Sequence, residues 1–166
     1  MFKTICIIGA IIGGISMMSG GQTPSTAQAG SVSAISVSGY QFIAKAVKAG
    51  IPESKAQVIS DVATEIGVAP QYIGAIGLTE SILNPDTVGD NGCSFGAYQN
   101  NLCANPQVKK ECVTDFTCST QNLAKWIKMK NCQASNWISC LSKWNGNNPP
   151  DWYTIKIQNN GQTLGL

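Results

Sequence analysis

The hydrophobic positions of the chain follow a helical period over much of its length. In residues 40–49, apolar side chains recur at spacings of three and four, which predicts an amphipathic helix that Gly50 and Pro52 end. A second apolar stripe predicts a helix with Ser54 as its N-cap and Gly67 at its end. Since each helix carries its apolar residues on one face, we expect these faces to lie against a common core.

A third predicted helix, over residues 70–83, is apolar around most of its circumference, which favours burial on several sides. Pro70 suits its first turn. Glu80 lies near its C-terminal end, where the helix dipole and the apolar neighbours both favour the protonated carboxyl. We therefore expect the pKa of Glu80 to be raised, as a general acid working near neutral pH requires.

Residues 84–101 are dense in Gly, Asn and Asp and predict a loop region with several tight turns. Two helices are expected beyond it. Ser119 is the predicted N-cap of a helix that includes residues 123–129, and Ser135 is the predicted N-cap of a helix over 137–144.

The tail after Pro150 fits two structures. Tyr153, Ile155 and Ile157 alternate as in a strand, whereas Asp151 is a good helix cap. In either case helices dominate, and a chain of 166 residues is sized for one compact domain once a leader is removed. The expected fold class is therefore mainly α, in a single domain.

The first 29 residues read as a secretory signal peptide. Lys3 supplies a positive charge, residues 5–18 are apolar, and Ala27-Gln28-Ala29 has the form of a cleavage site. An uncleaved anchor is the alternative, but the apolar run is shorter than the ~20 residues of a spanning helix. We expect a periplasmic or secreted protein without a stable membrane span after cleavage. The predicted leader, linker and folded domain are residues 1–29, 30–39 and 40–166.

Six of the seven cysteines lie in the second half of the chain, whereas Cys6 leaves with the leader. An even set in an exported protein predicts disulfides, although six cysteines allow 15 pairings. Short loops make the pairs Cys112–Cys118 and Cys132–Cys140 plausible. No CxxC spacing points to a metal site. The disulfide candidates are Cys93, Cys103, Cys112, Cys118, Cys132 and Cys140.

The sequence contains neither His nor Arg, and this restricts its chemistry. Nucleophile systems that use His, and typical catalytic zinc sites, are improbable without imidazole. The net charge of +2, without a basic stripe, gives no footprint of a nucleic-acid binder. Acid-base chemistry then falls to the nine Asp and Glu residues, and we predict no cofactor and no metal.

Several short motifs occur in one order along the chain. Glu80-Ser81 precedes Asn84-Pro85, and a Gly-rich stretch ends in Ser-Phe-Gly-Ala-Tyr-Gln at residues 94–99. Lys-Trp-Asn-Gly follows at residues 143–146, then Tyr153 and Lys156-Ile157. Together, over roughly residues 70 to 160, they resemble the signature of the lysozyme-like lytic transglycosylases, the soluble type with an SLT domain.

The resemblance implies a lysozyme-like domain with helices around a substrate cleft, and peptidoglycan glycan strands as the substrate. In such an enzyme Glu80 donates a proton to the glycosidic oxygen. It then accepts a proton from the 6-hydroxyl of the muramic acid, which closes to a 1,6-anhydro product.

The same motifs suggest further substrate-binding residues. Ser81 and Gln99 can hydrogen-bond the carboxyl or the sugar, and Tyr98 and Trp144 can stack on sugar faces or line the cleft. Asn145 is a candidate substrate contact. The family usually has Tyr where Trp144 stands, so a hydroxyl is missing at that place.

Two other functions stay open at this stage. One is a hydrolytic muramidase in which Asp90 activates water, as in goose-type lysozyme. The other is a wall-binding or assembly protein of the same fold without activity. A small exported protein of this kind also fits partners in secretion, pilus or phage assembly.

Overall fold

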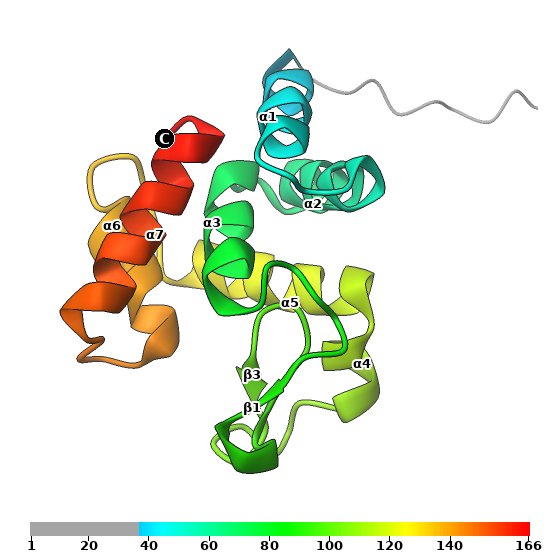
Figure 1. Cartoon of the computed structure of the whole chain (residues 1–166), viewed down its shortest axis with the longest axis vertical. Coiled ribbons are helices and arrows are strands. Elements are labelled where there is room, and N and C mark those ends of the chain that lie inside the picture. The colour runs from blue at the N-terminus through cyan, green and yellow to red at the C-terminus, as the bar shows by residue number, and fades with distance from the viewer. Residues whose placement is uncertain (1–36) are drawn as a thin grey trace, which may run out of the picture. The chain divides into compact units, whose positions relative to one another are not determined.

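The computed structural model describes residues 37–166, so the predicted leader and most of the predicted linker lie outside the described residues. The described part is mostly helical, with three short strands and three disulfides (Figure 1). The elements are α1 (Val37–Lys48), α2 (Glu53–Ile66), α3 (Pro70–Glu80), β1 (Val88–Gly89), the 3-10 turn η1 (Asp90–Gly92), β2 (Ser94–Phe95), β3 (Asn100–Asn101), α4 (Lys110–Thr114), α5 (Phe116–Met129), α6 (Trp137–Ser142), the 3-10 turn η2 (Lys143–Asn145) and α7 (Asp151–Leu164).

Helix α3 is the central element of the core. It packs against α7 most extensively and also against α1, α2 and α5 (Figure 1). Ile73 and Ile76 are completely buried, and nearly the whole helix from Tyr72 to Thr79 is inaccessible. The prediction of a helix buried on several sides is confirmed, and its partners come from both ends of the described chain.

The first two predicted helices are present, with corrections at their N-termini. Helix α1 begins at Val37, so the last residues of the predicted linker are helical. Helix α2 begins after Pro52, whose φ of −55° already suits a helix entrance, and the predicted cap Ser54 lies inside the first turn. Gly67 ends α2 with a φ of 78°, the left-handed conformation expected of a C-terminal glycine.

The later helices are also present, but their predicted caps are wrong. Helix α5 begins at Phe116 because the carboxylate of Asp115 accepts a hydrogen bond from the Cys118 N–H at 2.7 Å, which places Ser119 in the interior. Helix α6 follows Asn136 rather than Ser135 and ends at Ser142, two residues earlier than predicted. The short helix α4 was not predicted.

The tail forms helix α7, and the strand alternative is wrong. Tyr153, Ile157 and Leu164 are buried on one face of the helix, whereas Ile155 is exposed. The alternation of apolar residues in the sequence therefore does not indicate a strand here. Pro150 precedes the helix, so Asp151 occupies its first turn rather than its cap.

The region between α3 and α4 contains the turns that the sequence predicts and a small antiparallel sheet. Its strand order is β1-β2-β3, with Val88 opposite Phe95 and Ser94 opposite Asn101. The strands have two residues each, so their pairing alone stabilises little. The disulfide Cys93–Cys103 links the residue before β2 to the turn after β3.

All six candidate cysteines form disulfides. The two local pairs, Cys112–Cys118 and Cys132–Cys140, are confirmed, with Cα–Cα distances of 5.1 and 5.5 Å. The remaining pair has a Cα–Cα distance of 5.3 Å. Each bridge closes a short loop, which restricts the unfolded chain. Among the described residues, no helix has both the length and the hydropathy needed to cross a bilayer.

Helix α3 ends at Glu80, three residues before the predicted end at Leu83. Ile82 and Leu83 both have positive φ, at 58° and 60°, and the Leu83 N–H donates to the Gly77 carbonyl at 3.0 Å. This reversal folds the Leu83 side chain back onto the helix. A Cβ placed on Gly77 would lie only 2.0 Å from Leu83 Cδ2, so Gly77 is required for the close approach.

We expect Gly77→Ala to destabilise the protein by about 1–3 kcal/mol, since the added methyl overlaps a completely buried Leu83. Urea unfolding of Gly77→Ala, Leu83→Ala and the double variant measures this. Because truncation of Leu83 removes the overlap, the double variant should lose less stability than the sum of the single variants. If the losses of stability in the two single variants add up in full in the double variant, the overlap with Leu83 is not the cause of the loss in Gly77→Ala.

Candidate functional site

Glu80 is the last residue of α3 and is half-buried. The hydroxyl of Tyr153 donates a hydrogen bond to Glu80 Oε1 at 2.5 Å. Tyr153 lies in the first turn of α7 and is only 1% exposed, so its ring is held by packing. The contact between α3 and α7 thus fixes the orientation of the Glu80 carboxyl.

Two other side chains of α7 bind the end of α3. Lys156 Nζ donates to the Thr79 carbonyl at 2.6 Å, and Asn160 Nδ2 donates to Thr79 Oγ1 at 2.9 Å. With Tyr153, these residues have spacings of three and four, which places them on one helix face. The ammonium of Lys156 also lies at the negative end of the α3 dipole, where a cation is stabilising.

The environment of Glu80 favours its protonated form. Burial raises the pKa of Glu80 from 4.5 to about 7, and the charge of Asp90 adds to this increase. The hydrogen bond from Tyr153 and the charge of Lys156 act in the opposite direction and lower the pKa. The net result is a carboxyl that gives up its proton near neutral pH. The raised pKa expected from the sequence thus agrees with the structure, with burial as the main cause.

The two oxygens of the Glu80 carboxyl differ in their contacts. Oε1 accepts the Tyr153 hydroxyl, whereas Oε2 has no hydrogen-bond partner within the described residues. Burial also raises the pKa of Tyr153, so its hydroxyl remains a donor when Glu80 is ionised. Oε2 is therefore the oxygen that can exchange a proton with another molecule.

Ser81 and Gln99 form hydrogen bonds within the protein rather than with Glu80. Ser81 Oγ donates to the Ala97 carbonyl at 2.8 Å and accepts from the Asn84 N–H at 3.0 Å. Gln99 Nε2 donates to the carbonyls of Thr87 and Gly96 at 3.1 and 3.0 Å. Both side chains hold the loop region together beside the end of α3.

Tyr98 and Trp144 have different environments, although the sequence suggests sugar contacts for both. Tyr98 is completely buried and its hydroxyl is 2.9 Å from Thr120 Oγ1, so its ring offers no face to a sugar. The indole N–H of Trp144 donates to the Tyr98 carbonyl at 2.8 Å, and its ring meets Trp126 edge to face at 5.1 Å. Trp144 is only partly buried.

Asp90 and Asn145 are both exposed. The Asp90 carboxylate accepts a hydrogen bond from the Ser94 hydroxyl across the β1–β2 turn. Asp90 therefore has a turn-forming role, and its charge still acts on Glu80. Asn145 is the last residue of η2, before Gly146 with its φ of 115°.

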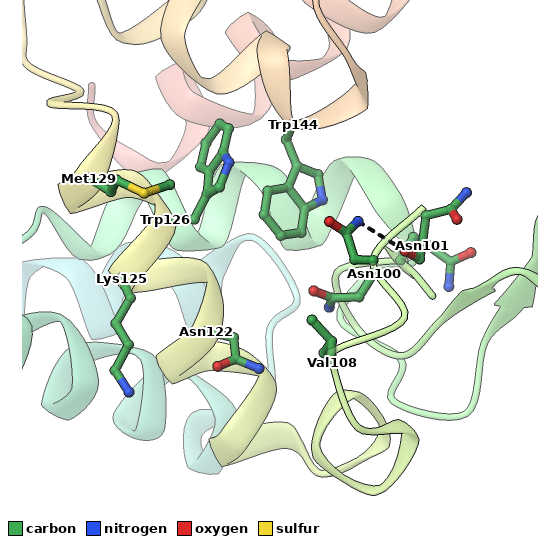
Figure 2. Close-up of a pocket in the computed structure, with 10 residues that line it drawn as sticks. Asn100, Asn101, Val108, Asn122, Lys125, Trp126, Met129 and Trp144 are labelled. Atoms are coloured by element: carbon green, nitrogen blue, oxygen red, sulfur yellow. Dashed lines mark hydrogen bonds between the residues drawn. The ribbon is translucent and has the colours of Figure 1, made fainter. Parts of the chain in front are cut away.

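A pocket of about 390 Å³ lies beside this region, and Figure 2 shows its lining. Gln99 and Trp144 both border it, so the structure brings together two of the predicted site residues. Glu80 and Asn145 are not among the lining residues. The Glu80 carboxyl and the pocket are thus separate features of the structure.

Sequence reasoning did not assign a role to Tyr153 or Lys156, the two α7 residues that act on Glu80. Both occur in the last of the ordered motifs, and their spacing of three residues is typical of a helix. The competing strand pattern places them on opposite faces. Knowledge that the tail is a helix would have pointed to both residues together.

Comparison of the chain with protein families, with curated proteins and with solved structures gives no match. The proposed function therefore depends on the geometry of the site and on the motifs in the sequence.

The raised pKa of Glu80 has a consequence for stability. The folded state binds the Glu80 proton more tightly than the unfolded state, so this residue contributes stability below pH 4.5 that is lost as the pH rises through about 7. We expect the stability of Glu80→Gln to fall less between pH 4.5 and 7.5 than that of the unmutated protein. Thermal unfolding across this range measures the difference, with the exposed Glu111→Gln as the control. Parallel pH profiles for Glu80→Gln and the unmutated protein would contradict the raised pKa.

Proposed function

We propose that the protein is a peptidoglycan lytic transglycosylase that cleaves the β-1,4 bond between N-acetylmuramic acid and N-acetylglucosamine. The observation that carries the proposal is a half-buried Glu80 with a pKa of about 7, oriented through one oxygen by Tyr153. A carboxyl that is strongly perturbed by burial is a common mark of a catalytic acid. The ordered motifs around it supply the substrate class.

The reaction follows from what Glu80 can do. Its protonated Oε2 gives a proton to the glycosidic oxygen as the C1–O bond breaks and the ring acquires oxocarbenium character. The resulting carboxylate then accepts the proton of the 6-hydroxyl, whose oxygen bonds to C1. The sugar closes to a 1,6-anhydro ring and Glu80 is protonated again, so no water is consumed.

A lysozyme-like fold is part of this proposal, and it rests on the motifs in the sequence. Glu80 ends a buried helix and is followed by a small antiparallel sheet and then by further helices. Tyr153 supplies a hydroxyl to the Glu80 carboxyl from α7. The sugar strand is proposed to pass Glu80 on the side of Oε2.

The proposed setting is the cell envelope, where peptidoglycan is accessible. Three disulfides among the described residues fit an oxidising compartment. Together with the leader expected from the sequence, they support export to the periplasm or beyond. Local opening of the wall during secretion, pilus or phage assembly suits a small enzyme of this kind.

A variant that lacks the Glu80 carboxyl tests the proposal. We expect Glu80→Gln to reduce the rate of sacculus solubilisation by roughly 10²–10⁴-fold, the usual contribution of a general acid. The rate is followed as the release of soluble muropeptides, with Glu111→Gln as the matched control and thermal unfolding as a check on folding. Equal solubilisation by Glu80→Gln and the unmutated enzyme would remove Glu80 from the reaction.

A variant of Tyr153 tests the pKa of Glu80 separately. Its hydrogen bond lowers the pKa of Glu80, so Tyr153→Phe should raise that pKa and move the alkaline fall in kcat/KM to higher pH. The phenyl ring preserves the packing, and Tyr40→Phe, at an exposed position, is the control. A lower rate with an unchanged pH profile is the result that contradicts this role.

A hydrolase is the second candidate, because the charge of Asp90 acts on Glu80. In that case Asp90 activates a water molecule, and this water attacks C1 of the sugar instead of the sugar's 6-hydroxyl. The hydrogen bond from the Ser94 hydroxyl occupies part of the Asp90 carboxylate and favours the transglycosylase. Digestion in water enriched in oxygen-18 separates the two, since only hydrolysis puts the label into the new sugar end.

A further inference from the structure

The pocket beside the loop region has two different walls. Trp126, Met129 and Lys125 come from α5 and Trp144 from η2, whereas Asn100 and Asn101 come from β3 (Figure 2). Figure 2 shows the two indole rings together at one end of the pocket. The aromatic wall is fixed, because the Trp144 N–H is bonded to the Tyr98 carbonyl.

The charge of the lining points to a ligand with a carboxylate. Lys125 is the only charged residue among those that border the pocket, and no Asp or Glu joins it. Its side chain is exposed, so the ammonium is accessible. A lysine beside amide side chains and without an acidic neighbour favours an anionic group over a neutral one.

The polar groups of the lining are mainly carboxamides. Side chains of Asn and Gln carry a donor and an acceptor side by side, which matches the N–H and C=O of a peptide bond. Asn100 is notable here, because its Nδ2 is buried and has no hydrogen-bond partner in the described part of the chain. A carbonyl oxygen that reaches this nitrogen after a small rotation of the amide would satisfy it.

We propose that this pocket binds the stem peptide that substitutes the glycan strand, with a peptide carboxylate at Lys125 and the peptide backbone along the carboxamides. The inference depends on the proposed function, since it names a part of the same substrate. Val108 and Met129 supply apolar surface for the peptide side chains. Glu80 lies outside the lining, so the peptide is held away from the bond that is cleaved.

A sugar ring is the competing ligand, and the lining favours the peptide. N-acetylglucosamine is neutral and makes no use of the Lys125 charge, whereas a stem peptide has free carboxylates. The arrangement also gives the pocket a role in specificity: a stem peptide should bind more tightly than a neutral disaccharide.

Titration with a free stem tetrapeptide and with N,N′-diacetylchitobiose tests the inference on the full chain. Trp126 and Trp144 report binding through their fluorescence, and calorimetry gives the Kd. We expect the tetrapeptide to bind and Lys125→Gln to weaken it roughly tenfold, as for loss of a hydrogen bond to a charged group. Lys130→Gln, at an exposed lysine five residues further along the chain, is the control.

The outcomes separate this inference from the proposed function. Binding of the disaccharide but not of the peptide, an unchanged Kd in Lys125→Gln, or no binding of either probe would each overturn the peptide assignment. None of these titrations uses Glu80. Cleavage of sacculi without peptide binding therefore defeats only this inference, whereas peptide binding without cleavage defeats the proposed function.

Discussion

The hydrogen bond between Tyr153 and Glu80, made in the interface between α3 and α7, is the interaction on which the site depends. Burial alone favours a neutral carboxyl, but it does not orient the group. The phenol, itself held by the core, fixes Oε1 and leaves Oε2 without a hydrogen-bond partner in the described part of the chain. One contact between segments 73 residues apart thus fixes where the Glu80 carboxyl points, whereas burial is the main cause of its raised pKa.

The end of α3 shows how the backbone supports this arrangement. Ile82 and Leu83 adopt positive φ directly after Glu80, a conformation that is costly for a β-branched residue such as Ile82. In the described part of the chain, five of the six non-glycine residues with positive φ lie between residues 82 and 99. Strained backbone concentrated beside a perturbed carboxyl is common at functional sites. Here the hydrogen bonds of Ser81 and Gln99 stabilise the strained segment.

The sequence predicts the long helices well because their apolar stripes have a clear period. Its errors fall where a local signal competes with tertiary contacts. Alternation at the start of α7 suggested a strand, yet packing against α3 selects the helix that buries Tyr153 and Ile157. The motif suggested that Tyr98 contacts a sugar, but its ring is completely buried in the core. The raised pKa of Glu80 was predictable, because the local sequence shows both its place near a helix end and its apolar neighbours.

The pKa of Glu80 is the most direct quantity to measure, and NMR can measure it in the folded protein. The side-chain carboxyl carbon of Glu80, assigned by comparison with Glu80→Gln, can be titrated in the folded protein without any substrate. A midpoint near pH 7 is the predicted result. A midpoint near 4.5, the value of an ordinary glutamate, would contradict the claim that burial keeps this acid protonated.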